Sequence, residues 1–458
     1  MLRLPRTFLP TSYAAQLAID PAVAGFDGTV AITGTLAERA QVIWLHGHGL
    51  QVTRAVASQS GTEVALTATQ HGDELLAFRA QAPLAAGTWT LTIAYKGAYD
   101  ERNTSGVFKQ TVAGAPYIYT QFEALYARRA FPCFDEPDSK VPWQLTLDVP
   151  AKLVAVSNTP IQRERAIAGG KKRIEFAQTK PLPSYLVAFG VGPFDVVGAG
   201  KTRGGKPVRV LTLQGRAAEA AYAAKTSAPL IDLLEELFGS PYPYEKMDML
   251  SIPITVGFGA MENAGLITYT ETLMLIDPKR ASREREYRWI SVAAHEIAHQ
   301  WFGNLVTMAW WDDIWLNEGF ANWVGRKIAA RFEPSWHEER AEVGQRNEAL
   351  EADSLVSARQ IRQPIAVPDD ILNVFDGITY NKGASVLNMF EGYVGSDVFQ
   401  RGVRAYLAQH TFRNATSTDF AAAISAAAGK DVGPAFATFL EQPGTPELTA
   451  TLVCDQGA

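Results

Sequence analysis

The sequence predicts an α+β protein of several domains, in which an antiparallel β-sheet domain precedes a mainly α-helical one. Its 458 residues correspond to roughly three domains at about 150 residues each. Apolar and polar residues alternate in segments of roughly the first 200 residues, which is typical of half-buried strands. Helical patterns dominate most of the remaining chain.

The strands of the first domain are indicated by alternation and by turn residues. Large apolar residues occupy every second position of 89–95 and again of 143–149, where Pro150 ends the pattern. Gly169-Gly170 lies between two apolar segments and predicts a hairpin turn. Segments of this kind, separated by Gly, Pro and Asn, predict an antiparallel sheet.

The character of the sequence changes near residue 200, where a Gly- and Lys-rich connector covers 198–206. After one more strand, residues 216–238 have a helical composition, and Pro229 is expected to break or restart that helix. Helical patterns return later in the chain, at 282–302, 317–350, 383–408 and 418–428.

These patterns divide the chain into three segments. We expect a β-rich domain at 1–199 and a mainly helical domain at 200–443. The last segment, 444–458, contains alternating apolar residues within 448–452. One strand cannot bury its own face, so we expect this segment to be the start of a truncated β-domain or a tail.

Charge and cysteine content narrow the functional class. The 42 Lys and Arg residues against 48 Asp and Glu give a formal net charge of −6, which disfavours a nucleic-acid binder. No uncharged apolar run reaches the ~18 residues that cross a bilayer, so we expect no membrane span.

The two cysteines and the N-terminus bear on the cellular compartment. Cys133 and Cys454 make neither a disulfide framework nor a Cys-based zinc site, although a single disulfide between them stays open. The N-terminus lacks a secretory signal, which indicates a cytoplasmic protein, or an exported one whose leader is absent from this sequence.

The strongest chemical signal is a His-Glu-x-x-His segment at 295–299. On a helix, residues four apart share a face, so His295 and His299 can reach one metal ion. The apolar residues around them recur at helical spacing. Glu296 is free to act as the general base, which would take a proton from a zinc-activated water and pass it to the leaving amine.

A catalytic zinc site needs a third protein ligand and an open position. Glu318 follows His299 with eighteen residues between them, enough to finish one helix, cross a loop and begin another. We therefore expect one Zn²⁺ ion on His295, His299 and Glu318. Each ligand histidine needs an acceptor for its second ring nitrogen, and the sequence leaves four candidates open: Asp312, Asp313, Asn317 and Asn322.

Several separate motifs together resemble the zinc aminopeptidases of the aminopeptidase N family. They are Gly-Ala-Met-Glu-Asn at 259–263, the His295–Glu318 pattern, Thr-Tyr-Asn-Lys-Gly at 379–383, and similar hallmarks at 131–137, 241–249 and 315–321. The resemblance covers the chain to about residue 445. It implies a saddle-like N-terminal sheet domain, a thermolysin-like catalytic domain, and peptides with a free N-terminus as substrates.

The resemblance also implies roles for single residues. Glu262 and Glu123 would bind the substrate α-ammonium, and Gln121 would add a hydrogen bond. Tyr380 would donate a hydrogen bond to the developing oxyanion. Four further residues of the same motif complete the predicted substrate-binding set. The backbone of Gly259 and Ala260 would lie along the substrate, and Asn263 would position it. Met261 is most simply a packing residue.

Two other functions stay open. One is an epoxide hydrolase of the leukotriene A4 hydrolase type, which Glu123 disfavours because those hydrolases carry Gln there. The other is a catalytically weak binding scaffold.

The resemblance also bears on how open the site is. Full-length relatives carry a helical domain after the catalytic one, and this sequence ends before such a domain, so we expect a more open site with weaker substrate retention. The sequence indicates neither oligomeric state nor side-chain preference.

Overall fold

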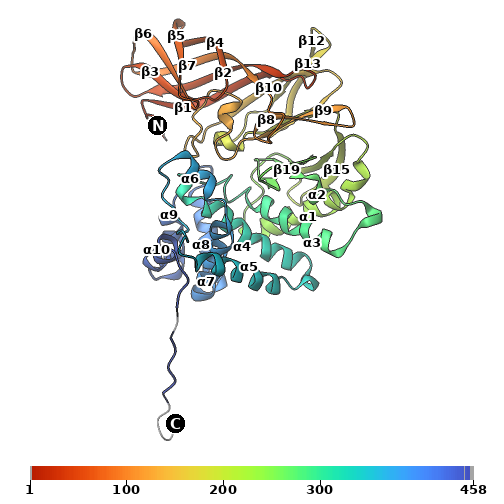
Figure 1. Cartoon of the computed structure of the whole chain (residues 1–458), viewed down its shortest axis with the longest axis vertical. Helices are drawn as coiled ribbons and strands as arrows, with labels where there is room; N and C mark the ends of the chain where they lie inside the picture. The colour runs from red at the N-terminus through yellow and green to blue at the C-terminus, as the bar shows by residue number, and fades with distance from the viewer. Residues whose placement is uncertain (1–2, 448, 454–458) are drawn as a thin grey trace.

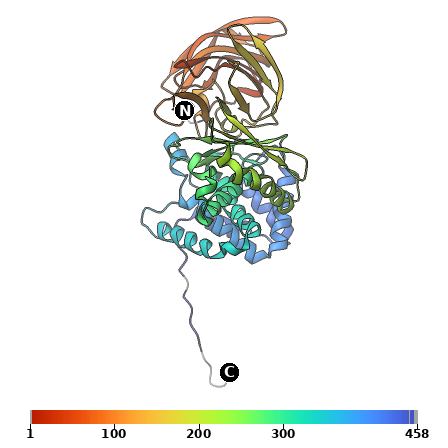
Figure 2. The ribbon, with the colours of Figure 1, turned by 90° about the vertical axis from the view of Figure 1, so that its right-hand side faces the viewer.

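The N-terminal half forms a layer of β-sheets, and a body of helices packs beneath it (Figure 1). The computed structural model describes residues 3–447 and 449–453. The view of Figure 2, turned by 90°, shows the same two layers. The predicted fold class, a β-sheet domain followed by a mainly helical one, is confirmed.

The largest sheet has ten strands in the order β12-β13-β10-β1-β2-β7-β4-β5-β6-β3. Its neighbours pair antiparallel except β1 and β10, which are parallel. The strands are β1 (Phe8–Ala18), β2 (Gly25–Leu36), β3 (Ala40–His46), β4 (Gln51–Gln59), β5 (Thr62–His71), β6 (Leu75–Leu84), β7 (Gly87–Ala98), β10 (Trp143–Pro150), β12 (Ile161–Ile167) and β13 (Lys171–Phe176).

The alternation seen in the sequence places one face of each strand in the core. On β7 the large residues at every second position of 89–95 are buried, while their neighbours are partly exposed or small. Gly169 and Gly170 join β12 to β13 with φ of +78° and +70°, a conformation that suits glycine. The predicted hairpin is therefore confirmed.

Two smaller sheets connect the large sheet to the helices. The four-stranded sheet contains β11 (Val154–Ser157), β14 (Phe189–Gly192), β9 (Ala115–Gln121) and β8 (Gly106–Val112), in that order. The five-stranded sheet contains β15 (Asp195–Lys201), β16 (Pro207–Thr212), β17 (Met247–Ile252), β19 (Leu266–Thr270) and β18 (Ala260–Met261), in that order. The predicted domain boundary at 199/200 falls inside β15 and stays a prediction.

The helical body holds ten α-helices in the described part of the chain. They are α1 (Ala221–Phe238), α2 (Glu271–Met274), α3 (Arg283–Ala298), α4 (Trp315–Phe332), α5 (Glu338–Asp353), α6 (Pro368–Asn373), α7 (Gly383–Val394), α8 (Ser396–Gln409), α9 (Ser417–Ala428) and α10 (Gly433–Glu441). The predicted helical stretch 317–350 is interrupted at 333–337, where Pro334 follows a helix end and His337 has φ of +57°. No described helix is long and apolar enough to span a bilayer.

The expected break at Pro229 is wrong, because α1 runs unbroken through this residue. Proline removes one backbone donor from the helix. The buried face of α1, which includes Leu230, Ile231 and Leu234, offsets that loss by packing into the core. Tertiary burial therefore outweighs the local preference of proline.

The end of the chain tests the predicted third segment only in part. The described residues after Gly444, 445–447 and 449–453, belong to no helix or strand. Leu448 and residues 454–458 lie outside the described residues. The start of a further β-domain at 444–458 therefore stays a prediction.

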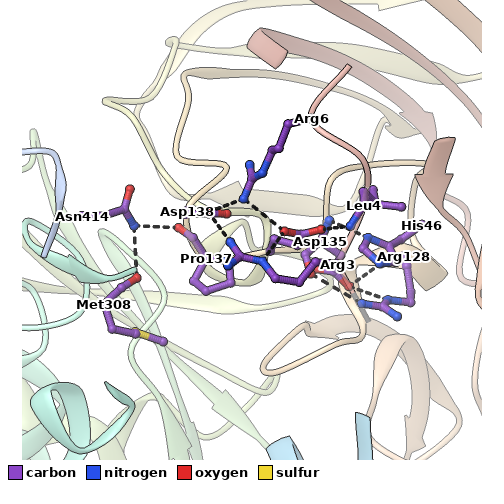
Figure 3. Close-up of polar contacts among 11 residues, drawn as sticks. Arg3, Leu4, Arg6, His46, Arg128, Asp135, Pro137, Asp138, Met308 and Asn414 are labelled. Carbon is purple, nitrogen blue, oxygen red and sulfur yellow. Dashed lines mark hydrogen bonds and ion pairs between the residues drawn. The ribbon is translucent and has the colours of Figure 1, made fainter. Parts of the chain in front are cut away.

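The acidic segment 135–138 makes contacts that join parts of the N-terminal sheet domain to one another (Figure 3). The Asp135 carboxylate accepts from Nε of Arg128 at 2.8 Å, and its backbone N–H donates to Nδ1 of His46 at 3.2 Å. All three side chains are buried. Asp135 thus ties the turn that follows β9 to the end of β3.

The same segment also joins the sheet domain to the helical body (Figure 3). Asp138 pairs with Arg3 and Arg6 near the start of the chain. The carbonyl of Pro137 accepts from the side chain of Asn414 at 2.9 Å, in the two-stranded sheet of β20 (Thr307–Met308) and β21 (Asn414–Ala415). These contacts hold the loop after β9, which contains residues 135–138, in place against the helical body.

Candidate functional site

Two helices bring the three predicted metal ligands together. His295 lies in the last turn of α3, His299 caps that helix, and Glu318 lies in the first turn of α4. The Nε2 atoms of the histidines are 2.9 Å apart, and one Glu318 oxygen lies 3.3 Å from His295 and 3.4 Å from His299. Burial works to raise the pKa of Glu318, but the two imidazoles lower it to about 2. An ionised carboxylate therefore faces two imidazole nitrogens.

The spacing of these atoms fits a tetrahedral metal ion. Zinc bonds of about 2.0–2.1 Å at tetrahedral angles put ligand atoms about 3.3–3.4 Å apart. The observed separations of 2.9, 3.3 and 3.4 Å lie close to that geometry. Two imidazole nitrogens facing each other also need a cation or a proton between them. These three residues therefore fit the ion that the motif predicts.

The orientation of His299 leaves its Nε2 free for a metal. Its Nδ1 lies 2.6 Å from Oδ1 of Asn317 and 3.1 Å from the carbonyl of Phe302. Of the four acceptors that the sequence left open, the structure places Asn317 against this ring. Gly303, with φ of +118°, makes room, because a Cβ there would lie 2.0 Å from the Asn317 oxygen. The acceptor pair fixes the tautomer that presents Nε2.

Replacing Asn317 by Ala is expected to weaken metal binding by roughly 10- to 100-fold, because His299 loses the nearer of the two acceptors that orient it. Competition with a fluorescent zinc chelator measures this change. The matched control is Asn347→Ala, since Asn347 is exposed on α5. Wild-type affinity in the Asn317→Ala variant would show that this contact does not orient the ring.

Glu296 is buried beside the metal ligands. It is not a member of the cluster formed by His295, His299 and Glu318. Its carboxylate lies within 4.8 Å of the ligand atoms of Glu262 and His299. Burial raises the pKa of Glu296 well above its ordinary value; His299 opposes the rise, and the Glu262 and Glu318 carboxylates add to it. A raised pKa makes this carboxylate a stronger base.

A second group of carboxylates adjoins the metal ligands. Oxygens of Glu123, Glu262 and Glu318 lie within 4.8 Å of one another. The Glu262 side chain accepts from Nδ2 of Asn317 at 2.9 Å. Its backbone carbonyl accepts from Gln300 and Asn304 at 2.9 and 2.7 Å. Glu262 is thus held in place by residues that follow the His-Glu-x-x-His segment and by Asn317 of α4.

Glu123 follows the end of β9 and faces Glu262 with unused hydrogen-bonding capacity. Its Oε1 is buried and has no hydrogen-bond partner among the described residues, and the same holds for Oε1 of Gln121. Burial and the neighbouring Glu262 carboxylate raise the pKa of Glu123 well above its ordinary value. Two carboxylates with a free acceptor at this distance match a small cation such as an ammonium group.

A cavity of about 930 Å³ opens onto all of these groups. Gly259, Ala260 and Glu262 line it together with Gln121 and Glu123. β18 is the last strand in the described five-stranded sheet, so its outer edge is unpaired there. An extended peptide can add to such an edge.

Two of the predicted substrate-binding residues do not line this cavity. Met261 is buried, and its sulfur lies 3.3 Å from Nε2 of Gln121. Asn263 is also buried, and its side-chain atoms have no hydrogen-bond partner among the described residues. A direct contact of either with substrate stays a prediction.

Tyr380 reaches the cavity from a short π-helix, Ile378–Lys382. Its ring lies nearly parallel to that of His295, with centroids 6.1 Å apart. Burial, with Glu318 as the next cause, raises the pKa of Tyr380 well above its ordinary value. The phenol therefore stays protonated at neutral pH and can donate a hydrogen bond.

Comparison with known protein families accounts for both parts of the chain. Residues 9–186 match the peptidase M1 N-terminal domain, and residues 222–439 match the peptidase family M1 domain. The chain belongs to peptidase family M1. The family implies zinc, and the His295, His299 and Glu318 cluster of this M1 chain lies within the second match.

Named relatives of this M1 chain come from plants, archaea and animals. Aminopeptidase M1 of Arabidopsis thaliana is 36% identical over 98% of this chain and 52% of its own length. Leucyl aminopeptidase of Saccharolobus solfataricus is 38% identical over 79% of this chain and 46% of its own. Human glutamyl aminopeptidase is 34% identical over 97% of this chain and 48% of its own. The chain thus spans about half the length of each relative.

Sequence reasoning missed several side-chain and backbone groups that support the site of this M1 chain. Gln300 and Asn304 hold the carbonyl of Glu262, although they lie only one and five residues after His299. Phe302 offers its carbonyl to His299, and no sequence pattern marks a backbone acceptor. Only the turn geometry after α3 brings these groups together.

Proposed function

We propose that this protein is a zinc-dependent aminopeptidase that hydrolyses the first peptide bond of peptides with a free N-terminus. The observation that carries the proposal is the position of Glu123 and Glu262, two carboxylates that adjoin the His-His-Glu cluster. A peptide ammonium bound there has its first carbonyl beside the metal site. Membership of peptidase family M1 supports the same reaction class.

One zinc ion would be held by His295, His299 and Glu318. When bound, it supplies a Lewis acid that polarises the peptide carbonyl and acidifies water. Asn317 and the carbonyl of Phe302 keep His299 in the ligating orientation. Zinc bonds of the usual length would place the three ligand atoms about as far apart as they lie in this structure.

Substrate binding would use carboxylates for the N-terminal ammonium of the peptide and backbone hydrogen bonds for the peptide chain that follows it. Glu123 and Glu262 bind the α-ammonium, and Gln121, which lines the same cavity and has a free Oε1, adds a hydrogen bond. The backbone of Gly259 and Ala260 pairs with the extended peptide at the edge of β18. These contacts set which peptide bond lies beside Glu296.

Proton transfer would be carried out by Glu296 and Tyr380. Glu296 takes a proton from the attacking water and passes it to the nitrogen of the leaving amine. The Tyr380 phenol donates a hydrogen bond to the oxygen that becomes negative. Both residues line the cavity, and neither is one of the three metal ligands.

The proposal is tested by following peptide masses over time. An unblocked hexapeptide is expected to lose residues one at a time from its N-terminus, while the N-acetylated form stays intact. Cleavage of internal bonds, or equal cleavage of the acetylated peptide, would contradict the proposal. The pair isolates the role of the free amine, because the two peptides otherwise share one sequence.

Glu262→Gln is expected to lower kcat/KM by roughly 10- to 100-fold, since a charged hydrogen bond to the ammonium becomes a neutral one. The amide keeps the size of the side chain. Steady-state kinetics on an aminoacyl-coumarin measures the change. Glu245→Gln, outside the cavity, is the matched control, and a Glu262→Gln variant with control-like kinetics would remove Glu262 from amine recognition.

A further inference from the structure

The cavity continues past the metal cluster between two helices that pack side by side (Figure 1). Tyr287 and Ser291 of α3 line it at positions eight and four residues before His295. Asn322 and Arg326 of α4 line it four and eight residues after Glu318. Eight residues of helix span about 12 Å, so Arg326 lies roughly that far along α4 from the metal ligand.

The position of the ammonium site gives this extension a direction. Asn317, at the N-terminal end of α4, donates to the Glu262 carboxylate. The ammonium site is therefore at the start of α4, and Arg326 is two turns farther along the same helix. A peptide with its amine at Glu262 and its first carbonyl at the metal cluster extends its leaving part toward Arg326.

Arg326 is a half-buried cation with spare hydrogen-bonding capacity. It donates from Nη2 to Oδ1 of Asn381 at 3.0 Å, and it takes part in no ion pair with any described residue. Burial lowers the pKa of Arg326, against the opposing effect of Glu342 and Glu338. A guanidinium carries five N–H donors, so most of them are left for a ligand.

Two carboxylates lie near Arg326, those of Glu338 and Glu342, and Glu338 lines the cavity. Glu338 of α5 accepts from the Tyr287 phenol at 3.3 Å. Its Oε2 is buried and has no hydrogen-bond partner among the described residues, so Glu338 and Arg326 line the same end of the cavity without a direct bond between them there. Arg326 is thus a cation lining this end of the cavity whose printed hydrogen bond, to Asn381, uses one of its donors.

We propose that Arg326 recognises a carboxylate on the leaving part of the peptide. The carboxylate is either the C-terminus of a short peptide or the side chain of an Asp or Glu after the scissile bond. A planar guanidinium binds such a group through two parallel hydrogen bonds. The inference rests on the proposed aminopeptidase function and assigns a specificity residue to the same cavity.

A purely structural role for Arg326 makes a different prediction. Oδ1 of Asn381 accepts from both Asn322 and Arg326, and Asn381 follows Tyr380 on the π-helix. If Arg326 only joined α4 to that helix, its loss would change turnover of every substrate by the same factor. Recognition of a carboxylate changes only the ratio between charged and uncharged peptides.

The test compares kcat/KM for three peptides in four proteins. The peptides are Leu-Ala-Ala, its C-terminal amide, and Leu-Asp-Ala amide. The proteins are the wild type, Arg326→Gln, Arg326→Lys, and the control Arg346→Gln, whose residue is exposed on α5 outside the cavity. Release of leucine from Leu-Ala-Ala amide reports the aminopeptidase activity independently of any carboxylate.

The wild type is expected to prefer at least one carboxylate-bearing peptide over the uncharged amide by roughly tenfold or more. Arg326→Gln is expected to bring that ratio close to one, while Arg346→Gln keeps it and Arg326→Lys keeps part of it. Which peptide is preferred distinguishes a C-terminal from a side-chain carboxylate. A wild-type ratio near one for both peptides, or an unchanged ratio in Arg326→Gln, overturns the inference. If no peptide releases leucine, the proposed function fails and the inference fails with it.

Discussion

Glu296→Gln is expected to reduce kcat by about three orders of magnitude while leaving the metal in place. The amide has the size of the carboxylate but cannot accept the proton that hydrolysis releases. Glu296 is buried at the wall of the cavity beside Glu262 and His299, and it is not one of the three predicted metal ligands. Steady-state kinetics and metal analysis of the purified variant measure the two parts of this expectation.

Glu284→Gln is the matched control for this variant. Glu284 lies on the same helix, α3, but is exposed and outside the cavity. Its replacement is expected to leave kcat within a factor of two of the wild type. If Glu296→Gln kept kcat within tenfold of the wild type with its metal bound, Glu296 could not be the general base.

Glu318→Ala is expected to remove both metal and activity. The change leaves two imidazoles where three ligands converge at separations of 2.9–3.4 Å. Three protein ligands are the usual minimum for a catalytic zinc site. We expect less than about a tenth of the wild-type metal content and a loss of kcat/KM of about three orders of magnitude or more. Metal analysis after dialysis and coumarin kinetics provide the measurements.

Thermal unfolding separates loss of metal from loss of fold in this variant. Added zinc is expected to raise the Tm of the metal-free wild type, because a ligand that binds only the folded state stabilises it. The Tm of Glu318→Ala is expected to stay unchanged on adding zinc. Glu348→Ala, at an exposed position of α5, is expected to respond like the wild type. A Glu318→Ala variant that still bound one zinc tightly would exclude Glu318 as a ligand.

The fold was predictable where one local pattern decided the structure. Period-two alternation marked β7, and the Gly169-Gly170 pair marked the β12–β13 hairpin. The continuity of α1 through Pro229 is not predictable from composition, because it depends on how the buried face of the helix packs. The parallel pairing of β1 with β10 joins residues more than 120 positions apart, which no local pattern predicts.

The candidate site was predictable for residues that belong to motifs. His295 and His299 follow from helical spacing, and Glu318 from the length of chain between two helices. Glu123 came from family resemblance alone, because an isolated glutamate after a strand carries no signal. Asn317 is one of four acceptors that the sequence leaves open, and the turn at Gly303 leaves room for it against His299.

The central claim is that one metal ion on His295, His299 and Glu318 drives removal of a free N-terminal residue. Its most direct test is to strip the protein of metal and titrate zinc back while following aminoacyl-coumarin hydrolysis. Activity is predicted to rise in proportion to added zinc and to level off at one ion per chain, with no hydrolysis of the N-acetylated substrate at any point. Full hydrolysis before zinc is added, in protein shown by elemental analysis to be free of metal, would contradict the claim.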